Sequence, residues 1–417
     1  MKVLSVCTSD TNGGAARAAY RIHQGVRSLG VDGQMLVKDK ETDDSNVHSL
    51  DEFTPSNLVV NAAEWCATKW QNKIQHAKWR PYRYTKERYF LSDLRGVKIY
   101  GALQKMDYDV LHLHWINNRF IDIRELTRVH KPIVWTLHDS WPFCGVCHLP
   151  MGCKLYESHC GKCPMLGSNK ERDIAFDVFE KKRAIYRHLD LHIVTPSKWL
   201  GDCAKRSALF GDFPVSIIPN CIDTELYQPT DKKRAAELLG LNHNKKYLLF
   251  GAMQSTTDKN KGFDLLVNAL QQLKRDDVEL IVYGTDEDLS KYEIPVPVHS
   301  LGYILHEEQM TLLYNAADVM IVPSRSENLS NSIMESMSCG TSVVAFNIGG
   351  NSDLIGHQQN GYLAQAQDSE DLVKGIQWCL NHNENNVLGK CAREKVLNSY
   401  MPEIVCKQYK DLYESLL

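Results

Sequence analysis

The sequence predicts an α/β fold of two doubly wound, Rossmann-like domains whose parallel sheets face each other across a central cleft. Apolar runs typical of buried strands alternate with segments of helical period along the whole chain, which is the pattern of βαβ units. The chain has 417 residues, roughly the length of two ordinary domains. The alternation is interrupted once, by a polar segment near the middle of the chain.

The first domain is predicted over residues 1–221. Apolar strands are expected at 3–9, 33–39, 109–115, 132–138 and 191–197. A helix is expected over 15–29, because apolar residues recur there at steps of three and four. A cysteine-rich segment, 144–163, is expected to be an insertion in this domain.

The second domain is predicted over residues 222–401. Pro219 and Pro229 flank the polar segment before it, which is typical of a linker. Strands are expected at 247–252, 278–284, 318–324 and 342–347, and helices at 263–273 and 307–316. The last helical segment, 402–417, suits either domain, and one alternative is that it packs back on the first domain.

Composition narrows the functional classes. Apolar residues make up 43% of the chain and charged residues 24%, as in soluble globular proteins. The net charge of −3 argues against a nucleic-acid partner that is bound by overall basicity. The first apolar run has five residues, which is too short for a signal peptide, and no run reaches the length of a membrane span. A cytoplasmic location is therefore expected.

Two loops at strand ends suit an anionic ligand, because ligands of parallel sheets bind at the carboxyl ends of the strands. Gly13 and Gly14 follow the first strand and open a helix, whose free N–H groups attract anions. They do not form the G-x-G-x-x-G motif, so a dinucleotide site is poorly supported. In the second domain, Lys261 precedes Gly262 in a similar loop. It suits a phosphate, although a solvated surface lysine is the simpler alternative.

The segment from Glu327 to Glu335 indicates a nucleotide-sugar site. It follows the strand 318–324, and residues 328–332 are rich in the capping types that begin a helix. The N–H groups of that helix favour a phosphate, and eight residues of helix rise roughly 12 Å. Carboxylates are pure acceptors, which suits the hydroxyls of a sugar and a ribose. The alternative is a solvated helix face.

The stretch from Pro323 to Gly350 resembles the signature of the large retaining glycosyltransferase family four, which has the GT-B fold. Two glutamates separated by seven residues, a small-Cys-Gly turn and a Val-Val strand carry the resemblance. Other matching pieces are Gly13-Gly14, His138 at the end of "VWTLHD", "TPSKWL", "IIPNCID" and Lys261-Gly262. The sequence is most similar to the bacterial exopolysaccharide and capsule group, which shares "GGAARAAYR" and a cysteine-rich segment.

The resemblance implies a role for each matching residue. Glu335 would hold the donor ribose, Glu327 would contact the transferred sugar, and His138 would contact that sugar near the reacting carbon. The diphosphate would rest on the amides of the helix entrance, with Lys261 neutralising it and Gly14 close to it. The amides of that entrance belong to Asn328, Leu329, Ser330 and Asn331.

One position departs from the family. Members commonly carry an arginine about five positions before the lysine, and that position here is Thr256. Neutralisation of the phosphates would then fall on Lys261, or on Lys259 or Arg325. His138 has a simpler alternative as well, because a histidine at the end of a buried strand can be a satisfied core residue.

Five of the thirteen cysteines crowd between positions 144 and 163. Two C-x-x-C pairs have a common zinc spacing, and a cytosolic chain makes disulfides unexpected. Members of the subgroup tend to keep the last four, so the resemblance favours a closed, structural zinc site. Its ligands would be Cys147, Cys153, Cys160 and Cys163. The alternative is a set of reduced or reversibly oxidised thiols.

The segment 64–98 carries nine lysines and arginines against three acidic residues, with seven aromatic residues among them. That mixture suits contact with an anionic membrane, at the inner face of the plasma membrane. It equally suits a charged acceptor, or aromatic side chains that pack on the first domain.

The sequence thus predicts a retaining glycosyltransferase that takes a UDP-sugar, with a GDP-sugar as second choice, and needs no catalytic metal. Its acceptor would be a glycan or a lipid-linked oligosaccharide in cell-surface polysaccharide synthesis. The alternatives are a nucleotide-sugar epimerase of the same fold and a non-catalytic, zinc-stapled assembly protein. A phosphorylase is disfavoured, because it would bring a pyridoxal-phosphate lysine and a much longer chain.

Overall fold

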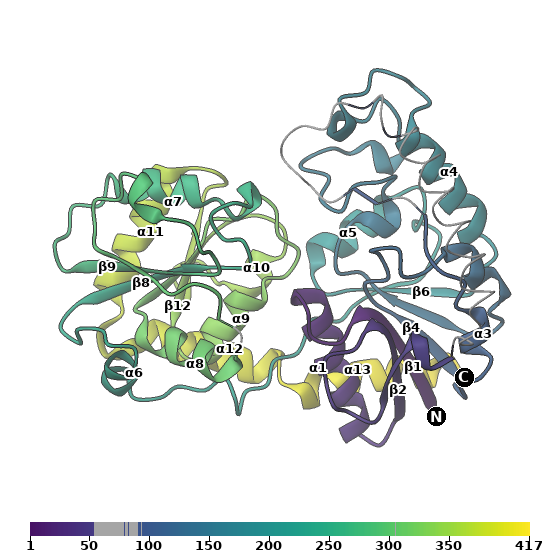
Figure 1. The fold of residues 1–417 in the computed structure, drawn as a ribbon. Coiled ribbons are helices and arrows are strands. Elements are labelled where there is room, and N and C mark those ends of the chain that lie inside the picture. The colour runs from purple at the N-terminus through teal and green to yellow at the C-terminus, as the bar shows by residue number, and fades with distance from the viewer. Residues whose placement is uncertain (54–78, 80–81, 83–90, 93, 305) are drawn as a thin grey trace. The chain divides into compact units, whose positions relative to one another are not determined.

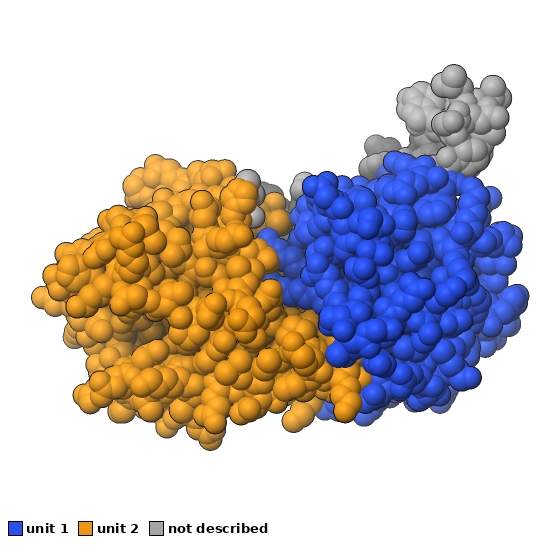
Figure 2. Space-filling view, turned by 90° about the horizontal axis from the view of Figure 1, so that it is seen from below, with its two compact units in different colours: residues 1–195, 200–217, 409–417 blue, residues 196–199, 218–408 orange. Residues whose placement is uncertain are grey.

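A computed structural model describes residues 1–53, 79, 82, 91–92, 94–304 and 306–417 (Figure 1). The chain divides into two compact units, coloured separately in Figure 2. Unit 1 comprises residues 1–195, 200–217 and 409–417, and unit 2 comprises residues 196–199 and 218–408. Each unit is built on one parallel sheet.

The sheet of unit 1 has seven strands in the order β3-β2-β1-β4-β5-β6-β7. The strands are β1 (Lys2–Ser9), β2 (Asp32–Asp39), β3 (Val47–Ser49), β4 (Val110–Leu113), β5 (Ile133–Thr136), β6 (Leu191–Thr195) and β7 (Val215–Ile217). All neighbouring pairs are parallel, and Val3 of β1 faces Gly33 on one side and Val110 on the other. Strands β4 and β5, near the middle of the sheet, are wholly buried, which explains why most of their residues are apolar.

Helices connect the strands of this first sheet. The α-helices are α1 (Gly14–Ser28), α3 (Tyr100–Leu103), α4 (Ile174–Tyr186) and α5 (Lys198–Arg206). Short 3-10 turns are η1 (Leu50–Phe53), η2 (Ile123–Arg128), η3 (Trp141–Phe143), η4 (Leu155–Glu157) and η5 (Pro164–Leu166). Of the apolar residues that recur at helical spacing, Ala18, Ile22 and Val26 are buried, and Leu29, just after α1, is partly exposed.

The sheet of unit 2 has six parallel strands in the order β10-β9-β8-β11-β12-β13. The strands are β8 (Lys246–Gly251), β9 (Val278–Tyr283), β10 (Val298–Ser300), β11 (Val319–Val322), β12 (Ser342–Phe346) and β13 (Gly361–Ala364). Short turns are η6 (Lys259–Lys261), η7 (Leu289–Lys291) and η8 (Glu384–Asn386). The order reverses between β8 and β11, which is the switch point where doubly wound sheets bind ligands.

Helices cover both faces of this second sheet (Figure 1). They are α6 (Lys232–Leu238), α7 (Phe263–Leu270), α8 (Glu307–Ala316), α9 (Asn331–Ser338), α10 (Asn351–Leu354), α11 (Ser369–His382) and α12 (Val387–Ser399). Alternate residues of β8 enter different cores. Leu249 joins the cluster formed with α6, α8, α9 and α12, whereas Leu248 and Phe250 join the one formed with α7 and α11.

The last helix, α13 (Pro402–Ser415), is divided between the units, because the boundary falls after Gln408. In unit 1, the Tyr413 hydroxyl lies 2.7 Å from Nδ1 of His112. The other ring nitrogen of His112 lies 2.8 Å from the Thr136 hydroxyl, which lies 3.1 Å from the Tyr409 hydroxyl. The end of the chain thus completes a buried polar network between β4 and β5. In the part of the chain that the structure describes, no helix has the length and apolar character needed to cross a membrane.

Candidate functional site

The predicted ligand loop follows β11 and leads into α9. Ser330 is the N-cap of α9 and has an extended backbone, but its side chain makes no capping bond to the helix. Its hydroxyl lies instead 2.9 Å from that of Ser332. The first N–H groups of a helix need partners from outside it, so this entrance suits an anion.

Lys261 lies beside Glu327. Their Nζ and Oε1 atoms are 3.5 Å apart, and the two side chains are 24% and 17% exposed. The side-chain amide of Asn260 also donates to the carbonyl of Ser326, at 2.9 Å. The loop after β8 and the loop after β11 therefore meet at the carboxyl ends of adjacent strands.

Gly262 explains how these two loops approach each other. Its φ is +72°, a left-handed conformation that favours glycine. A Cβ atom there would lie 1.9 Å from the carbonyl oxygen of Pro323. Any other residue would push the loop of Lys261 away from the loop of Glu327.

The glycine pair after β12 supports the same loop from another side. Gly349 has a φ of +51°, and a Cβ atom would lie 1.7 Å from the carbonyl oxygen of Glu327. The N–H of Gly350 donates to the carbonyl of Asn328 at 2.8 Å. The backbone at 349–350 thus packs directly on the backbone at 327–328 and fixes the position of Glu327. No side chain would fit between these two segments.

Glu335 lies in the second turn of α9 and is only 4% exposed. The Tyr314 hydroxyl donates to its Oε2 atom at 2.9 Å. The two glutamates therefore differ, because Glu327 contacts a cation and Glu335 contacts a neutral donor. Sequence reasoning missed Tyr314. The available signal was that a tyrosine on the apolar face of a helix needs a partner for its hydroxyl.

The position of the missing arginine and the cations predicted to replace it have contacts of their own. The Thr256 hydroxyl lies 2.7 Å from that of Thr285. Arg325 donates to both carboxylate oxygens of Asp264, at 2.9 and 2.6 Å, and to the carbonyl of Lys259. The guanidinium of Arg325 thus contacts the first turn of α7, whereas Lys261 pairs with Glu327.

The remaining predicted site residues belong to unit 1. Gly14 is the first residue of α1, and Gly13 before it has a φ of +95°. Nε2 of His138, just after β5, lies 3.1 Å from Nδ1 of His114. Burial lowers the pKa of His138 to about 4, so its imidazole is neutral at pH 7. Contacts of His138 and Gly14 with a donor remain predictions.

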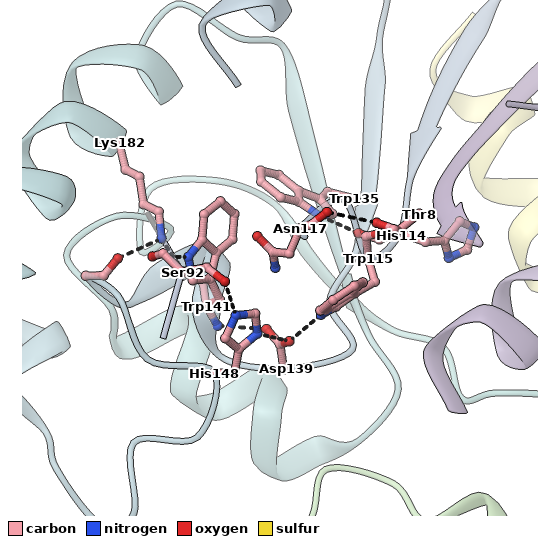
Figure 3. A network of polar contacts seen from close by, with 11 residues as sticks. Thr8, Ser92, His114, Trp115, Asn117, Trp135, Asp139, Trp141, His148 and Lys182 are labelled. Atoms are coloured by element: carbon pink, nitrogen blue, oxygen red, sulfur yellow. Dashed lines mark hydrogen bonds and ion pairs between the residues drawn. The ribbon is translucent and has the colours of Figure 1, made fainter. Parts of the chain in front are cut away.

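Asp139, next to His138, anchors the start of the cysteine-rich insertion (Figure 3). It accepts hydrogen bonds from the Trp115 indole and the Trp141 amide, both at 2.8 Å, and from His148 at 2.5 Å. His148 also contacts the Ser92 hydroxyl at 2.9 Å. Burial by itself would raise the pKa of Asp139, but His148 and the N–H donors outweigh burial and hold it below its usual value.

The five cysteines of the insertion line one small cavity of about 20 Å³. They carry free thiols, and the Gly145 amide donates to Sγ of Cys160 at 3.2 Å. Among the described residues, however, no group of three or more potential ligands is placed to hold a metal ion. The predicted zinc site of Cys147, Cys153, Cys160 and Cys163 is therefore not supported. Cys147, Cys160 and Cys163 are buried, and Cys153 is partly exposed.

The predicted membrane segment, 64–98, lies largely outside the described residues. Two of its aromatic residues are described. Trp79 is 8% exposed, and the Tyr82 hydroxyl accepts the N–H of Ile174 at 3.1 Å. These two side chains fit the alternative of packing on the first domain.

Comparisons with known proteins place the chain among glycosyltransferases. Residues 12–226 match a family model described as Glycosyltransferase Family 4, and residues 244–382 match one described as Glycosyl transferases group 1. A glycosyl transferase of Escherichia coli, whose provisional name places it in colanic acid biosynthesis, is 22% identical over 75% of this chain and 76% of its own. The lipopolysaccharide 1,2-N-acetylglucosaminetransferase of Salmonella typhimurium is 26% identical over 53% of this chain and 61% of its own.

Solved structures share the fold at low sequence identity. Sucrose-phosphate synthase from Thermosynechococcus elongatus has a TM-score of 0.66 at 18% identity, covering 100% of this chain and 98% of its own. The Anabaena protein HepE, solved in complex with UDP-glucose, has a TM-score of 0.65 at 16% identity, covering both chains completely. The two parallel-sheet units and these relatives define a glycosyltransferase with the GT-B fold, as predicted. The family model over residues 12–226 covers more than half of the chain, which therefore belongs to glycosyltransferase family 4.

Proposed function

We propose that the protein is a retaining glycosyltransferase that moves a sugar from a UDP-sugar to a hydroxyl of a glycan or lipid-linked acceptor. The observation that carries the proposal is the arrangement around α9. Glu327 and Glu335 flank a helix entrance without a side-chain cap, and Lys261 lies 3.5 Å from Glu327. The carboxylates can thus accept from hydroxyl groups, and the N–H groups of the helix entrance between them can donate to a diphosphate.

In this proposal, the diphosphate rests on the first amides of α9, and Lys261 neutralises the charge that grows on it as the leaving group departs. Such preorganised donors act on charge that develops in the transition state. The bond from the anomeric carbon to the diphosphate oxygen breaks, and a bond to the acceptor oxygen forms on the same face of the sugar. The acceptor proton leaves with the nucleoside diphosphate. Lysine and helix supply the stabilisation without a catalytic metal.

The carboxylates act as clamps for hydroxyls. Glu335 would accept from the ribose and Glu327 from the transferred sugar, because an ionised carboxylate offers only acceptors. His138 would contact the sugar near its reacting carbon. A neutral imidazole suits that contact, since it has one N–H donor and one acceptor nitrogen.

Similar proteins support the choice of substrates. HepE was solved with UDP-glucose, which favours a UDP-sugar over a GDP-sugar as donor. The names of the colanic acid and lipopolysaccharide relatives support a role in cell-surface polysaccharide synthesis. We further propose that the protein works in the cytoplasm, where segment 64–98 contacts the inner face of an anionic membrane.

Thermal-shift measurements against UDP-, GDP-, ADP- and dTDP-sugars test the proposal, because a ligand of the native state raises the melting temperature. We expect the largest shift with a UDP-sugar. Glu335→Gln and Lys261→Ala should each weaken that binding roughly tenfold to a hundredfold, as expected for lost bonds to a charged group. The control is Glu308→Gln, which changes an exposed carboxylate on α8.

The result that overturns the proposal is the absence of a shift with every nucleotide sugar, or unchanged binding in both site variants. Product analysis then separates the classes of enzyme. A transferase releases the nucleoside diphosphate only as sugar reaches an acceptor, whereas an epimerase yields a new nucleotide sugar with no acceptor present. The anomeric configuration of the product, measured by NMR, tests retention.

A further inference from the structure

The carboxylate of Glu335 is buried in α9 and accepts a hydrogen bond from the Tyr314 hydroxyl of α8, at 2.9 Å. A buried carboxylate is costly unless hydrogen bonds compensate it. Tyr314 is completely buried. Burial first, and nearby Tyr283 and Glu335 next, raise the pKa of Tyr314 well above its usual value. The hydroxyl therefore keeps its proton and remains the donor of this bond.

Tyr314 is itself fixed by its neighbours. Its backbone carbonyl accepts the Thr341 hydroxyl at 2.6 Å, and its own hydroxyl lies 3.5 Å from that of Tyr283. The Tyr283 ring in turn lies on the backbone of Gly251, where a Cβ atom would come within 2.3 Å of the ring. A line of fixed contacts thus runs from β8 through β9 and α8 to the carboxylate on α9.

We propose that Tyr314 is a positioning residue that holds the Glu335 carboxylate in the orientation in which it binds the ribose hydroxyls of the donor. This inference rests on the proposed function, because it takes Glu335 as the ribose ligand. The bond from Tyr314 to Oε2 restrains rotation of the carboxylate, and each carboxylate oxygen can accept more than one hydrogen bond. Neighbouring hydroxyls on a ribose need two acceptors in a set orientation, which a rotating carboxylate would hold for only part of the time.

The test compares UDP with 2′,3′-dideoxyuridine diphosphate, which lacks both ribose hydroxyls, by calorimetry on the full chain. We expect Tyr314→Phe to weaken UDP binding about tenfold, as for a lost bond to a charged group. Binding of the dideoxy nucleotide should change less than about twofold, because it makes no bond to Glu335. If the thermal-shift measurements show that the protein prefers GDP-sugars, GDP and its dideoxy analogue replace UDP and dideoxy-UDP.

The matched control is Tyr247→Phe. Tyr247 is also buried in unit 2, and its hydroxyl bonds to the backbone of Asn242 at 2.9 and 3.1 Å. Its loss should change the two affinities by the same factor. Glu335→Gln should abolish most of the preference for UDP over the dideoxy nucleotide. Equal weakening of both nucleotides in Tyr314→Phe would show that Tyr314 only packs, and would overturn the inference.

Two further outcomes separate this inference from the proposed function. If Glu335→Gln loses the ribose preference but Tyr314→Phe keeps it, only the role of Tyr314 is overturned. If wild type shows no ribose preference, the ribose role of Glu335 fails, and the inference fails with it. If Tyr314→Phe does not fold, the same two affinities are measured for Tyr283→Phe, which removes the hydroxyl 3.5 Å from that of Tyr314. A smaller loss confined to UDP supports the inference, and an equal loss with both nucleotides overturns it.

Discussion

Lys182 is a buried cation in unit 1. Its ammonium donates to the carbonyl of Trp141 at 2.5 Å (Figure 3). It also donates to the carbonyls of Cys144 and Gly145, at 2.8 and 3.1 Å. It also lies 3.6 Å from the centre of the Trp141 ring. Burial lowers the pKa of Lys182 to about 7, although the thiols beside it oppose that shift. One side chain therefore ties α4 to the start of the insertion.

The free energy of unfolding should consequently depend on pH through Lys182. The folded pKa is about 7 against an ordinary value of 10.5, so between these values the unfolded chain binds more protons. Stability should then rise with pH across this window, by at most about 1.4 kcal/mol per unit. Lys182→Met removes this contribution.

The measurement is urea unfolding, followed by tryptophan fluorescence at pH 7.5, 8.5 and 9.5. Wild type should gain stability relative to Lys182→Met as the pH rises. Subtracting the two curves cancels the titration of groups that do not interact with Lys182. The control is Lys181→Met, an exposed neighbour on α4, for which the difference should stay constant. A constant difference for Lys182→Met as well would contradict the lowered pKa.

At the scale of elements, α13 is the clearest case in which a segment distant in sequence completes a core. Its residues from 409 onward belong to unit 1, and Tyr413 contacts His112 of β4 across 301 positions of sequence. Burial lowers the pKa of His112 to about 3, so the imidazole is neutral and needs one partner for each nitrogen. Tyr413 and Thr136 supply them.

Tyr413→Phe should therefore destabilise unit 1 by about 1–3 kcal/mol, the cost of leaving a buried polar atom unsatisfied. Tyr409→Phe should cost less, because the Thr136 hydroxyl that it contacts keeps its bond to His112. Thermal unfolding of both variants measures the difference. Equal stability of Tyr413→Phe and wild type would mean that the imidazole finds another partner.

At the scale of the whole molecule, the chain has a net charge of −3 but carries a basic, aromatic segment at 64–98. Charges of that kind attract anionic lipids, at about 1 kcal/mol for each lysine or arginine near the surface. We expect the protein to sediment with vesicles of anionic phosphatidylglycerol and not with neutral phosphatidylcholine. High salt should weaken the binding, because it screens the charges.

The matched variants remove the same charge from two places. Changing Lys69, Lys73 and Lys78 to glutamine should weaken vesicle binding roughly a hundredfold, by the same rule for each charge. Changing the exposed Lys181, Lys233 and Lys274 should leave it nearly unchanged. Equal losses of vesicle binding in both variants would mean that binding depends on the net charge of the protein and not on segment 64–98.

The sequence predicted most of the fold because strands and helices leave periodic patterns. The strands at 3–9 and 132–138 became β1 and β5, and the helix at 307–316 became α8. It also indicated the loops of Lys261 and Glu327, since a loop after a parallel strand opens at one known edge of the sheet. The two glycines at 349–350 were part of the family signature, and the structure adds the close backbone contacts that require them.

The sequence by itself determined the α/β class, the family and the segments from which the site is built. Each of these can be recognised from residues that lie close together along the chain. Only the tertiary structure decided which distant side chains meet. It brought Tyr314 to Glu335 and Arg325 to Asp264. It also placed the cysteines around a small cavity without arranging them as metal ligands. The physical reason is that hydrogen bonds and metal bonds depend on distances of a few ångströms, which the packing of helices on a sheet sets and local spacing does not.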